Sequence, residues 1–306
     1  MSEIRVFSPA SVSNVTCGFD VLGFALEGLG DEVVVAESST PGVQIKEIIG
    51  ADLPLEPEKN TAGKAALSFL EKTGITTGIE ITIYKNLPIG SGIGSSASSA
   101  AAAAYACNML FDTPLDNDEL LNVALDGEFV ASGSYHGDNI APALFGGFLL
   151  IRSLDPIDIL SLDYPENLYC ALLMPNQSVS TKEARGLLPK EYSLKTVVQQ
   201  TANIASLVHA LAHSDFDLLA RSMKDYLAEP YRATLLPWYD SVCAAAKSEG
   251  AFGYGISGSG PAFFAFGDSQ DHVNRLGKEM ENALVKHGFT TNVYTSRVSE
   301  TGAVEL

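Results

Sequence analysis

Basic side chains are scarce in this sequence. Its 19 lysines and arginines stand against 37 aspartates and glutamates, and the formal net charge is −18. A surface with this excess of negative charge repels nucleic acid and anionic lipid. We therefore expect neither nucleic acid nor a membrane among the partners, and any phosphate group must be held by local backbone dipoles.

Cysteine is also scarce, and long apolar runs are absent. The four cysteines, Cys17, Cys107, Cys170 and Cys243, form no Cys-x-x-Cys pair, which argues against a disulfide framework or a zinc knuckle. No window reaches the ~18 apolar residues of a membrane span, and the first residues lack the basic and apolar regions of a secretion signal. We expect a cytoplasmic protein with reduced thiols.

The length and composition suffice for two packed domains, since the chain has 306 residues of which 46% are hydrophobic. Strand-like and helical segments alternate without the regular rhythm of a doubly wound sheet, so we predict an α+β fold with helices on antiparallel sheets. Turn-rich sequence at Asp155-Pro156 and Asp163-Tyr164-Pro165 places the domain boundary near it, giving domains 1–160 and 161–306.

Short β-branched runs and helix caps predict the individual elements. Strands are expected at residues 4–7, 31–37, 43–49, 78–84, 168–174, 252–257, 262–266 and 290–298. Helices are expected between the Asn60 cap and Gly74, from Ala97 to Ala106, from the Asp116–Glu119 capping box to about Gly133, at 194–213, 216–224 and 237–247, and from Ser269 onward.

A loop rich in glycine and serine, residues 88–98, joins an expected strand to an expected helix. Glycines alternate at positions 90, 92 and 94, so the backbone can turn its N–H groups toward one point. With the helix N-terminus and the serine hydroxyls, these groups make a cradle for phosphate. A plain chain reversal needs neither the alternation nor the serines, so we predict that this loop holds the phosphates of ATP.

Two other nucleotide motifs are excluded. The pattern G-x-x-x-x-G-K-[ST] is absent, so the chain is not a Walker-type NTPase. A G-x-G-x-x-G pattern occurs at Gly253, Gly255 and Gly258, but it leads through Gly260-Pro261 into an apolar strand, whereas a dinucleotide fingerprint opens a helix. We interpret residues 253–261 as a second glycine and serine loop, with a plain turn as the alternative.

Two further features suggest metal ligands. Glu128 lies beside Gly127 on an expected helix, and Mg²⁺ bound to a triphosphate needs only one or two protein ligands, although a helical glutamate taken alone is usually solvated. His209 and His213 lie four residues apart, as zinc ligands can. Because no third ligand is evident, we expect this pair to lie on a partly buried helix face.

Three segments occur in an order that resembles the GHMP kinase superfamily, and the resemblance covers nearly the whole chain. They are residues 9–14 followed by 18–23, the loop at 88–98, and residues 255–261. Within the superfamily, residues 14–23, 132–142 and 181–185 are similar to the homoserine kinase family. One departure is Ile93, where the superfamily loop usually has Leu or Met.

The resemblance implies a two-domain fold, with an N-terminal domain like domain 2 of ribosomal protein S5 and a ferredoxin-like C-terminal domain. It implies ATP-dependent phosphorylation of L-homoserine to O-phospho-L-homoserine in threonine biosynthesis, by direct in-line transfer with Mg²⁺. The partners would be the small molecules ATP and L-homoserine, and a homodimer is compatible with the family.

The resemblance also assigns roles to residues. The ATP phosphates would contact Pro88, Ile89, Gly90, Ser91, Gly92, Ile93, Gly94, Ser95, Ser96, Ala97 and Ser98, together with Gly258, Ser259 and Gly260, and Mg²⁺ would bind Ser96 and Glu128. The substrate-binding residues would be Asn14, Asp20, His136, Asn139, Thr181, Arg185 and Arg232, and the catalytic set would be Asn14, Asp20, Asn139, Arg185 and Arg232.

The chemistry of a small zwitterion agrees with this assignment. Asn14, Asp20 and Asn139 would hold the amino and hydroxyl end of homoserine, and Arg185 and Arg232 its carboxylate. His136 and Asp138 are the nearby candidates for a base, and no Asp–Lys pair like that of mevalonate kinases is evident.

Three alternatives remain. A different GHMP kinase would act on another alcohol such as mevalonate, which has no ammonium group for Asn14 and Asp20 to bind. A sensor would bind nucleotide and metabolite without turnover. A dehydrogenase would need the glycines at 253–258 to bind NAD, and it ranks last.

Overall fold

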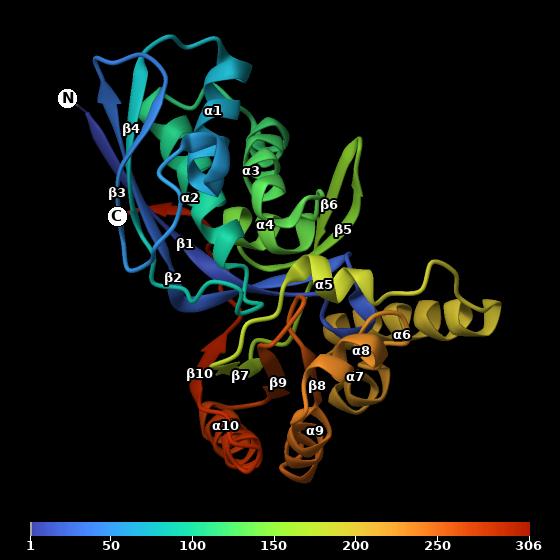
Figure 1. Ribbon diagram of the computed structural model, residues 1–306. Coiled ribbons are helices and arrows are strands. Elements are labelled where there is room, and N and C mark those ends of the chain that lie inside the picture. Colours follow the sequence, from blue (N-terminus) through green and yellow to red (C-terminus); the bar gives the residue numbers. More distant parts are fainter. Residues whose placement is uncertain (1) are drawn as a thin grey trace.

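The computed structural model describes residues 2–306, which form two β-sheets with helices packed on them (Figure 1). Helices α1 to α4 cover one face of the first sheet, and α9 and α10 cover one face of the second. The predicted α+β class is confirmed. No helix within residues 2–306 has the length and apolar character that crossing a membrane requires.

The first sheet has seven strands. They are β1 (Glu3–Ser13), β2 (Leu22–Ser38), β3 (Val43–Ile49), β4 (Gly78–Tyr84), β5 (Phe148–Leu154), β6 (Ile157–Ser161) and β11 (Val304–Glu305). The order is β11-β1-β2-β4-β3, β5 pairs with β2, and β6 pairs with β5. Only β3 and β4 are parallel. Because β11 pairs with β1, the end of the chain returns to the first sheet; the division at residue 160 stays a proposal.

The helices of the first domain begin and end where their caps lie. They are α1 (Thr61–Thr73), α2 (Ser95–Leu110), α3 (Asn117–Ser132) and α4 (Gly137–Phe145). The Asn60 side chain accepts hydrogen bonds from two N–H groups of α1, and Gly74 ends this helix in the left-handed conformation. The Asp116–Glu119 capping box opens α3, which ends at Gly133. The predicted caps are confirmed.

A single glycine brings α3 close to α1 and α2. A Cβ atom on Gly127 would lie 2.6 Å from the Thr61 carbonyl oxygen and 3.0 Å from the Ala100 Cβ. Only glycine permits this approach of the three helices. As a consequence, the next residue, Glu128, reaches the first turn of α2, where Ser96 lies.

The second sheet contains β7 (Tyr169–Pro175), β8 (Gly253–Ile256), β9 (Phe263–Gly267) and β10 (Thr291–Arg297), in the antiparallel order β10-β7-β9-β8. Helix α9 (Tyr239–Ser248) precedes β8, and α10 (Gln270–Val285) follows β9. The resulting β-α-β-β-α-β order is the ferredoxin-like arrangement that the resemblance implies. Four helices separate β7 from α9: α5 (Thr181–Gly186), α6 (Leu194–His213), α7 (Phe216–Ser222) and α8 (Glu229–Arg232).

An apolar layer between the two sheets holds the domains together. Ala10 and Phe24 of the first sheet pack in one buried cluster with Phe264 and Phe266 of the second. The rings of Phe24 and Phe266 have their centroids 5.4 Å apart. This buried cluster joins the two domains, and loops from both line one cavity.

The structure differs from the sequence prediction in several places. Strands β5, β6 and β11 and helices α5 and α8 were not predicted, and β2 begins at Leu22 instead of residue 31. Strand β1 continues to Ser13 instead of ending at Phe7, so residues 9–13 of the first motif belong to the strand. Asp155-Pro156 is the tip of the β5–β6 hairpin, not part of a linker, because the same residue types favour both. Helix α4 was missed because it contains Pro142, which is rare in helix interiors.

Candidate active site

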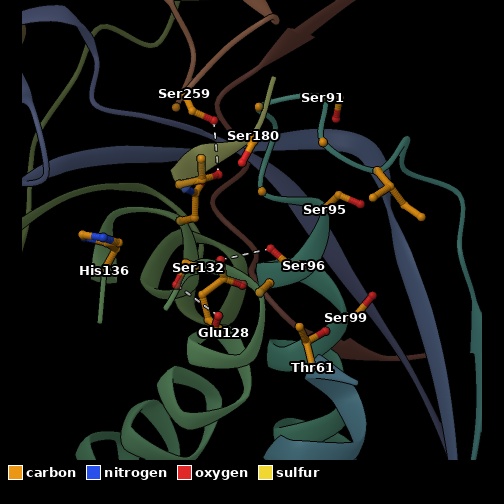
Figure 2. Close-up of a pocket in the computed structure, with 18 of the residues that line it drawn as sticks. Thr61, Ser91, Ser95, Ser96, Ser99, Glu128, Ser132, His136, Ser180 and Ser259 are labelled. Atoms are coloured by element: carbon orange, nitrogen blue, oxygen red, sulfur yellow. Dashed lines mark hydrogen bonds between the residues drawn. The ribbon is translucent and has the colours of Figure 1, made fainter. Parts of the chain in front are cut away.

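A cavity of about 430 Å³ lies between the two domains. Its walls come from distant parts of the chain: the end of β1, the loop after β4, the end of α3, the start of α4, and the segments around α5, α8 and β8. Figure 2 shows lining residues from several of these segments, among them Ser96, Glu128 and Ser259. Clefts between domains with a few convergent polar groups are the usual place for small-molecule ligands. The candidate site is therefore this cavity.

The glycine loop, residues 88–94, forms one wall. Gly90, Gly92 and Gly94 have φ angles of 66°, 84° and 68°, in the left-handed region that favours glycine. A second loop, residues 257–262, packs directly on the first, because the Ser257 hydroxyl donates to the Gly92 carbonyl oxygen at 2.7 Å and the Ala262 N–H donates to the Ser91 carbonyl oxygen at 2.9 Å. The two loops inferred from the sequence thus form one unit, although Gly253 and Gly255 belong to strand β8.

The residues predicted to contact the ATP phosphates, 88–98 and 258–260, do not all face the cavity. Ile89, Gly90, Ser91, Gly92, Gly94, Ser95 and Ser96 line the cavity, as do Gly258 and Ser259 of the second loop. Pro88, Ile93, Ala97, Ser98 and Gly260 do not line it. The buried Ser98 hydroxyl donates to the Ser8 carbonyl oxygen at 2.6 Å, so this serine ties α2 to β1.

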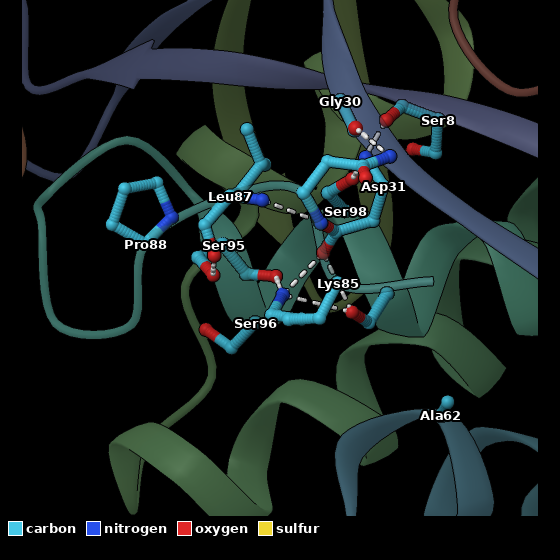
Figure 3. A network of polar contacts seen from close by, with 12 residues as sticks. Ser8, Gly30, Asp31, Ala62, Lys85, Leu87, Pro88, Ser95, Ser96 and Ser98 are labelled. Carbon is cyan, nitrogen blue, oxygen red and sulfur yellow. Dashed lines mark hydrogen bonds and ion pairs between the residues drawn. The ribbon is translucent and has the colours of Figure 1, made fainter. Parts of the chain in front are cut away.

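A buried ion pair lies under the glycine loop (Figure 3). The Lys85 ammonium, at the end of β4, donates to the Asp31 carboxylate, to the Ser95 carbonyl oxygen and to the Ser99 hydroxyl. Burial lowers the pKa of Lys85, and Asp31 opposes this shift. The other Asp31 oxygen accepts the N–H of Leu87 at 2.9 Å. The pair therefore fixes the strand, the loop and the first turn of α2 to one another.

The sequence analysis missed this pair. The expectation concerned only a catalytic pair like that of mevalonate kinases; Asp31 and Lys85 form a buried ion pair held in register by the pairing of β2 with β4. Removing one partner would leave a buried charge, which costs about 3–5 kcal/mol. Lys85 also lines the cavity, and the hydrogen bonds of the pair fix the shape of the loop.

Glu128 is buried at the end of α3 nearest the cavity. Its Oε1 accepts a hydrogen bond of 3.0 Å from the Ser96 hydroxyl, and its Oε2 has no partner among residues 2–306. Burial raises the pKa of Glu128 to about 7. A carboxylate and a hydroxyl with a free oxygen beside a phosphate cradle are the donor set that fits Mg²⁺, and the alternative of a solvated glutamate is wrong.

Two guanidinium groups and a carboxylate mark the other end of the cavity. Arg185 Nη2 donates to both oxygens of Asp20 at 2.8 Å. The buried Arg232 donates from Nη1 to the Gly258 carbonyl oxygen at 2.8 Å. The Phe19 ring centroid lies 5.6 Å from the Arg185 guanidinium carbon and 5.1 Å from that of Arg232. Neither Nε atom has a hydrogen-bond partner among residues 2–306. Both arginines line the cavity, and guanidinium groups bind anionic ligands well.

The two predicted asparagines already make hydrogen bonds within the chain. Asn14 donates to the Gly258 carbonyl oxygen at 2.8 Å and accepts the Asp20 N–H at 3.0 Å. Asn139 donates to the Ser13 hydroxyl at 2.9 Å and accepts from that of Ser11 at 2.8 Å. These contacts hold the loop 14–20 and the start of α4 in place.

Two titratable groups are candidates for a base. Asp138, in the first turn of α4, is buried, and its Oδ1 has no hydrogen-bond partner within the described residues 2–306; burial raises its pKa to about 7. Burial lowers the pKa of His136, while the nearby Asp20 opposes this. The His136 ring nitrogen Nδ1 lies 3.7 Å from Asp20 Oδ1. The pKa of Asp138 thus lies near neutral pH and that of His136 below its usual value, but the base role stays a prediction.

Three buried carboxyls make the ligand-free fold sensitive to pH. Burial raises the pKa of Glu128, Asp138 and Glu229 to about 7 each. The native state therefore binds more protons than the unfolded state, and the free energy of unfolding should fall as pH rises from about 5 to about 8. His136 has the opposite effect, because its lowered pKa makes the native state bind fewer protons than the unfolded state. It is one group against three carboxyls, so the net fall with pH remains. Denaturant midpoints across this range test the sign, and a midpoint that rises with pH contradicts it.

The cavity brings together all of the predicted substrate-binding residues. Asn14, Asp20, His136, Asn139, Thr181, Arg185 and Arg232 line it. The Thr181 hydroxyl lies 3.3 Å from that of Ser259, which joins α5 to the second loop. Sequence reasoning missed Lys59 and Thr61, which also line the cavity; only the helix cap beside them gave a signal.

His209 and His213 lie elsewhere, on α6. Their rings stack with centroids 4.0 Å apart, and both side chains are exposed. The expectation of a partly buried helix face is wrong, because α6 buries the side that carries Leu207 and Leu211. Among residues 2–306, no group of three or more His, Cys, Asp or Glu side chains could hold a metal ion.

Comparison with known proteins places this geometry in a family. The model of the GHMP kinases N terminal domain matches residues 60–147, and that of the GHMP kinases C terminal domain matches residues 207–286. Homoserine kinase of Chlorobium phaeobacteroides (strain BS1) is 44% identical over 99% of both chains. Homoserine kinase of Chloroherpeton thalassium is also 44% identical over 99% of both.

A solved structure agrees with these matches. The crystal structure of homoserine kinase from Cytophaga hutchinsonii ATCC 33406 has a TM-score of 0.96 and 44% identity, covering 100% of this chain and 98% of that one. The predicted two-domain GHMP kinase fold is confirmed. On these grounds the chain belongs to the GHMP kinase family and, within it, to the homoserine kinases.

Proposed function

We propose that the protein transfers the γ-phosphoryl group of ATP to the hydroxyl of L-homoserine, forming O-phospho-L-homoserine in threonine biosynthesis. One observation carries the proposal. A single cavity joins a glycine loop suited to phosphates to a cluster of Asp20, Arg185 and Arg232 suited to a small zwitterion. The full-length relatives at 44% identity are homoserine kinases, which supports the same substrate.

The glycine loop and α2 would bind the triphosphate. The left-handed glycines line the cavity and would turn backbone N–H groups toward the phosphates, and the N-terminus of α2 would add its dipole. Since the chain has net charge −18, these local donors must offset the repulsion of a polyanion. We assign Gly258 and Ser259 of the second loop to the same phosphates.

Ser96 and Glu128 would hold Mg²⁺ against the phosphates. When bound, Mg²⁺ neutralises charge on the β- and γ-phosphate oxygens, the main requirement of phosphoryl transfer. The support is the unpaired, buried Oε2 of Glu128 beside the Ser96 hydroxyl. Two protein ligands are enough, since Mg²⁺ usually keeps several waters.

Homoserine would bind by replacing the ion pair between Asp20 and Arg185. The ammonium group would take the Asp20 carboxylate, and the substrate carboxylate would take the guanidinium groups of Arg185 and Arg232. One internal ion pair is thereby exchanged for two with the ligand. A substrate without an ammonium group would leave Asp20 without a partner.

The two substrates would meet beside Asn139. A Cβ atom on Gly94 would lie 2.9 Å from Asn139 Oδ1, so this amide borders the glycine loop while facing the cavity. We assign Asn139 and Asn14 to the orientation of the homoserine hydroxyl for in-line attack. Alignment of this kind supplies most of the rate in phosphoryl transfer, and Asp138 or His136 would take the proton.

A coupled assay of ADP release tests the function. We expect release that depends on L-homoserine, and much weaker release with mevalonate or 4-hydroxybutyrate, neither of which has an ammonium group. Faster turnover of mevalonate than of homoserine would show that mevalonate is the better candidate for the substrate. ATP binding without turnover of any of the three would indicate a sensor. The cytoplasmic location and a homodimer also remain proposals.

Removing Arg185 should weaken homoserine binding selectively. We expect Arg185→Ala to raise KM for homoserine about 10-fold, because a charged hydrogen bond is lost, with KM for ATP nearly unchanged. Arg185→Lys should restore part of the loss, since an ammonium group cannot form the planar fork. Arg275→Ala on the exposed surface of α10 is the control. An equal increase in KM for homoserine and KM for ATP would contradict the assignment of Arg185 to the homoserine carboxylate.

A further inference from the structure

The loop 14–20, which carries Phe19 and Asp20, has an unusual backbone. Asn14, Val15 and Thr16 have φ angles of 68°, 37° and 56°, and Asp20 has 59°. The left-handed region is unfavourable for residues other than glycine, and most of all for β-branched ones such as Val15 and Thr16. Such a backbone persists only where surrounding contacts determine it.

On the side facing the cavity, Asn14 supplies these contacts, as described above. A second side chain that hydrogen-bonds to the loop comes from α6. The Nε2 atom of the buried Gln200 donates to the Cys17 carbonyl oxygen at 2.8 Å. Gln200 is thus the side-chain anchor for the middle of the loop.

The same amide group reaches a second segment. Gln200 Nε2 also donates to Asp225 Oδ1 at 2.9 Å, and Gln200 Oε1 accepts the N–H of Tyr226 at 2.8 Å. The Asp225 carboxylate accepts three further N–H groups, from Leu227 at 2.8 Å, Ala228 at 2.9 Å and Glu229 at 2.6 Å. Asp225 therefore fixes the start of α8, the helix that ends at Arg232.

We propose that Gln200 and Asp225 are positioning residues for the amino-acid end of the site. The pair joins the loop that presents Asp20 to the helix that presents Arg232, and so sets the distance between the groups for the ammonium and the carboxylate. Neither residue lines the cavity. The inference rests on the function proposed above and adds that substrate selectivity depends on this buried pair.

The pair should be sensitive to loss of either member. Without Gln200, the Cys17 carbonyl oxygen loses its side-chain donor and the backbone of the loop can relax toward common φ angles. Without the Asp225 carboxylate, the N–H groups at the start of α8 lose their acceptor. Both changes should loosen Asp20 relative to Arg232 and leave the glycine loop in place.

Gln200→Met tests the proposal, since it removes the hydrogen bonds and keeps the length of the side chain and its helix propensity. We expect KM for L-homoserine to rise about 10-fold and KM for ATP to stay within about two-fold. Selectivity for L- over D-homoserine, as the ratio of kcat/KM values, should fall about five-fold or more. Enantiomers differ only in the arrangement of three groups, so discrimination requires the sites for the ammonium, carboxylate and hydroxyl groups to be fixed relative to one another. A merely structural role would lower the unfolding midpoint without moving this ratio.

Gln199→Met is the matched control, as Gln199 is the exposed neighbour on the same helix. Asp225→Asn repeats the test if Gln200→Met does not fold, with the same split between the two KM values expected. In the double variant Gln200→Met/Asp225→Asn, KM for homoserine should rise by a factor well below the product of the factors for the two single variants. The reason is that both residues act through one contact.

Two results overturn the proposal while leaving the function intact. One is a Gln200→Met variant with the homoserine KM and L/D ratio of Gln199→Met, and the other is an equal rise in both KM values. The function itself fails by a different result: no homoserine-dependent ADP release by the unmodified protein, which would overturn this inference as well.

Discussion

Glu128→Gln should lower kcat by about 1,000-fold, because the metal neutralises phosphate charge in the transition state and little other chemistry is left to the protein. The substitution keeps the size of the side chain and removes the negative charge that would hold Mg²⁺. Stability should be kept or increased, since a buried carboxyl with a pKa raised to about 7 is replaced by a neutral group. Initial rates at saturating ATP and homoserine, with a Mg²⁺ titration, measure the effect.

Two comparisons show whether the effect is specific. Glu71→Gln changes an exposed glutamate on α1 and should leave both kcat and the Mg²⁺ requirement unchanged. Ser96→Ala should act in the same direction as Glu128→Gln but more weakly, because water can replace a neutral hydroxyl ligand. A near-normal kcat for Glu128→Gln at ordinary Mg²⁺ concentrations would remove Glu128 from the metal site, and Asp138 and Asp20 would be the next candidates.

The phosphate end of the site was predictable because its signal is local. Alternating glycines and following serines lie within eleven residues, and the left-handed φ angles that they imply are present at Gly90, Gly92 and Gly94. The packing of the second loop on the first was not predictable. It depends on a contact between Ser257 and Gly92, 165 residues apart, which no local pattern encodes.

The amino-acid end was found only through the family resemblance. Asp20 and Arg185 are 165 residues apart and form a pair in the folded chain. Lys85 and Asp31 had no family signal at all, since their contact follows from the register of β4 on β2. Gln200 escaped for the same reason, because its partners Cys17 and Asp225 lie on separate segments.

The fold followed the sequence where local capping decides it. Asn60 and Asp116 start their helices as predicted. Prediction failed where tertiary packing overrides local preference. Helix α4 keeps Pro142 in its interior, and Gly23 packs against its Asp138 carbonyl, where a Cβ atom would lie 1.8 Å from that oxygen. Packing on β2 thus stabilises a helix that propensity alone disfavours.

The second large effect concerns the contact between the two loops. A Cβ atom on Gly92 would lie 2.6 Å from the Ser257 carbonyl oxygen and 2.8 Å from that of Gly260. Both are backbone atoms, so Gly92→Ala must displace one loop from the other. We expect kcat/KM for ATP to fall about 100-fold, since a displacement of about 1 Å in a positioning element costs that much.

Gly42→Ala separates this collision from backbone strain. Gly42 has a φ of 89°, close to the 84° of Gly92, but a Cβ atom there would have no neighbour within 4 Å. Both substitutions should lower stability by about 1–2 kcal/mol because alanine disfavours the left-handed region. Only Gly92→Ala should lose activity. Unfolding midpoints and steady-state kinetics on both variants measure the two effects.

Gly92→Ala should also weaken homoserine binding, unlike any change confined to the ATP end. The loop that it displaces carries the Gly258 carbonyl oxygen, which accepts hydrogen bonds from Asn14 and Arg232 at 2.8 Å each. Movement of this oxygen disturbs both groups assigned to the amino acid, so KM for homoserine should rise together with KM for ATP. If Gly92→Ala raised KM for ATP alone, the second loop would not connect the two ends of the site. If the kinetics of Gly92→Ala matched those of Gly42→Ala, the contact between the loops would tolerate a methyl group.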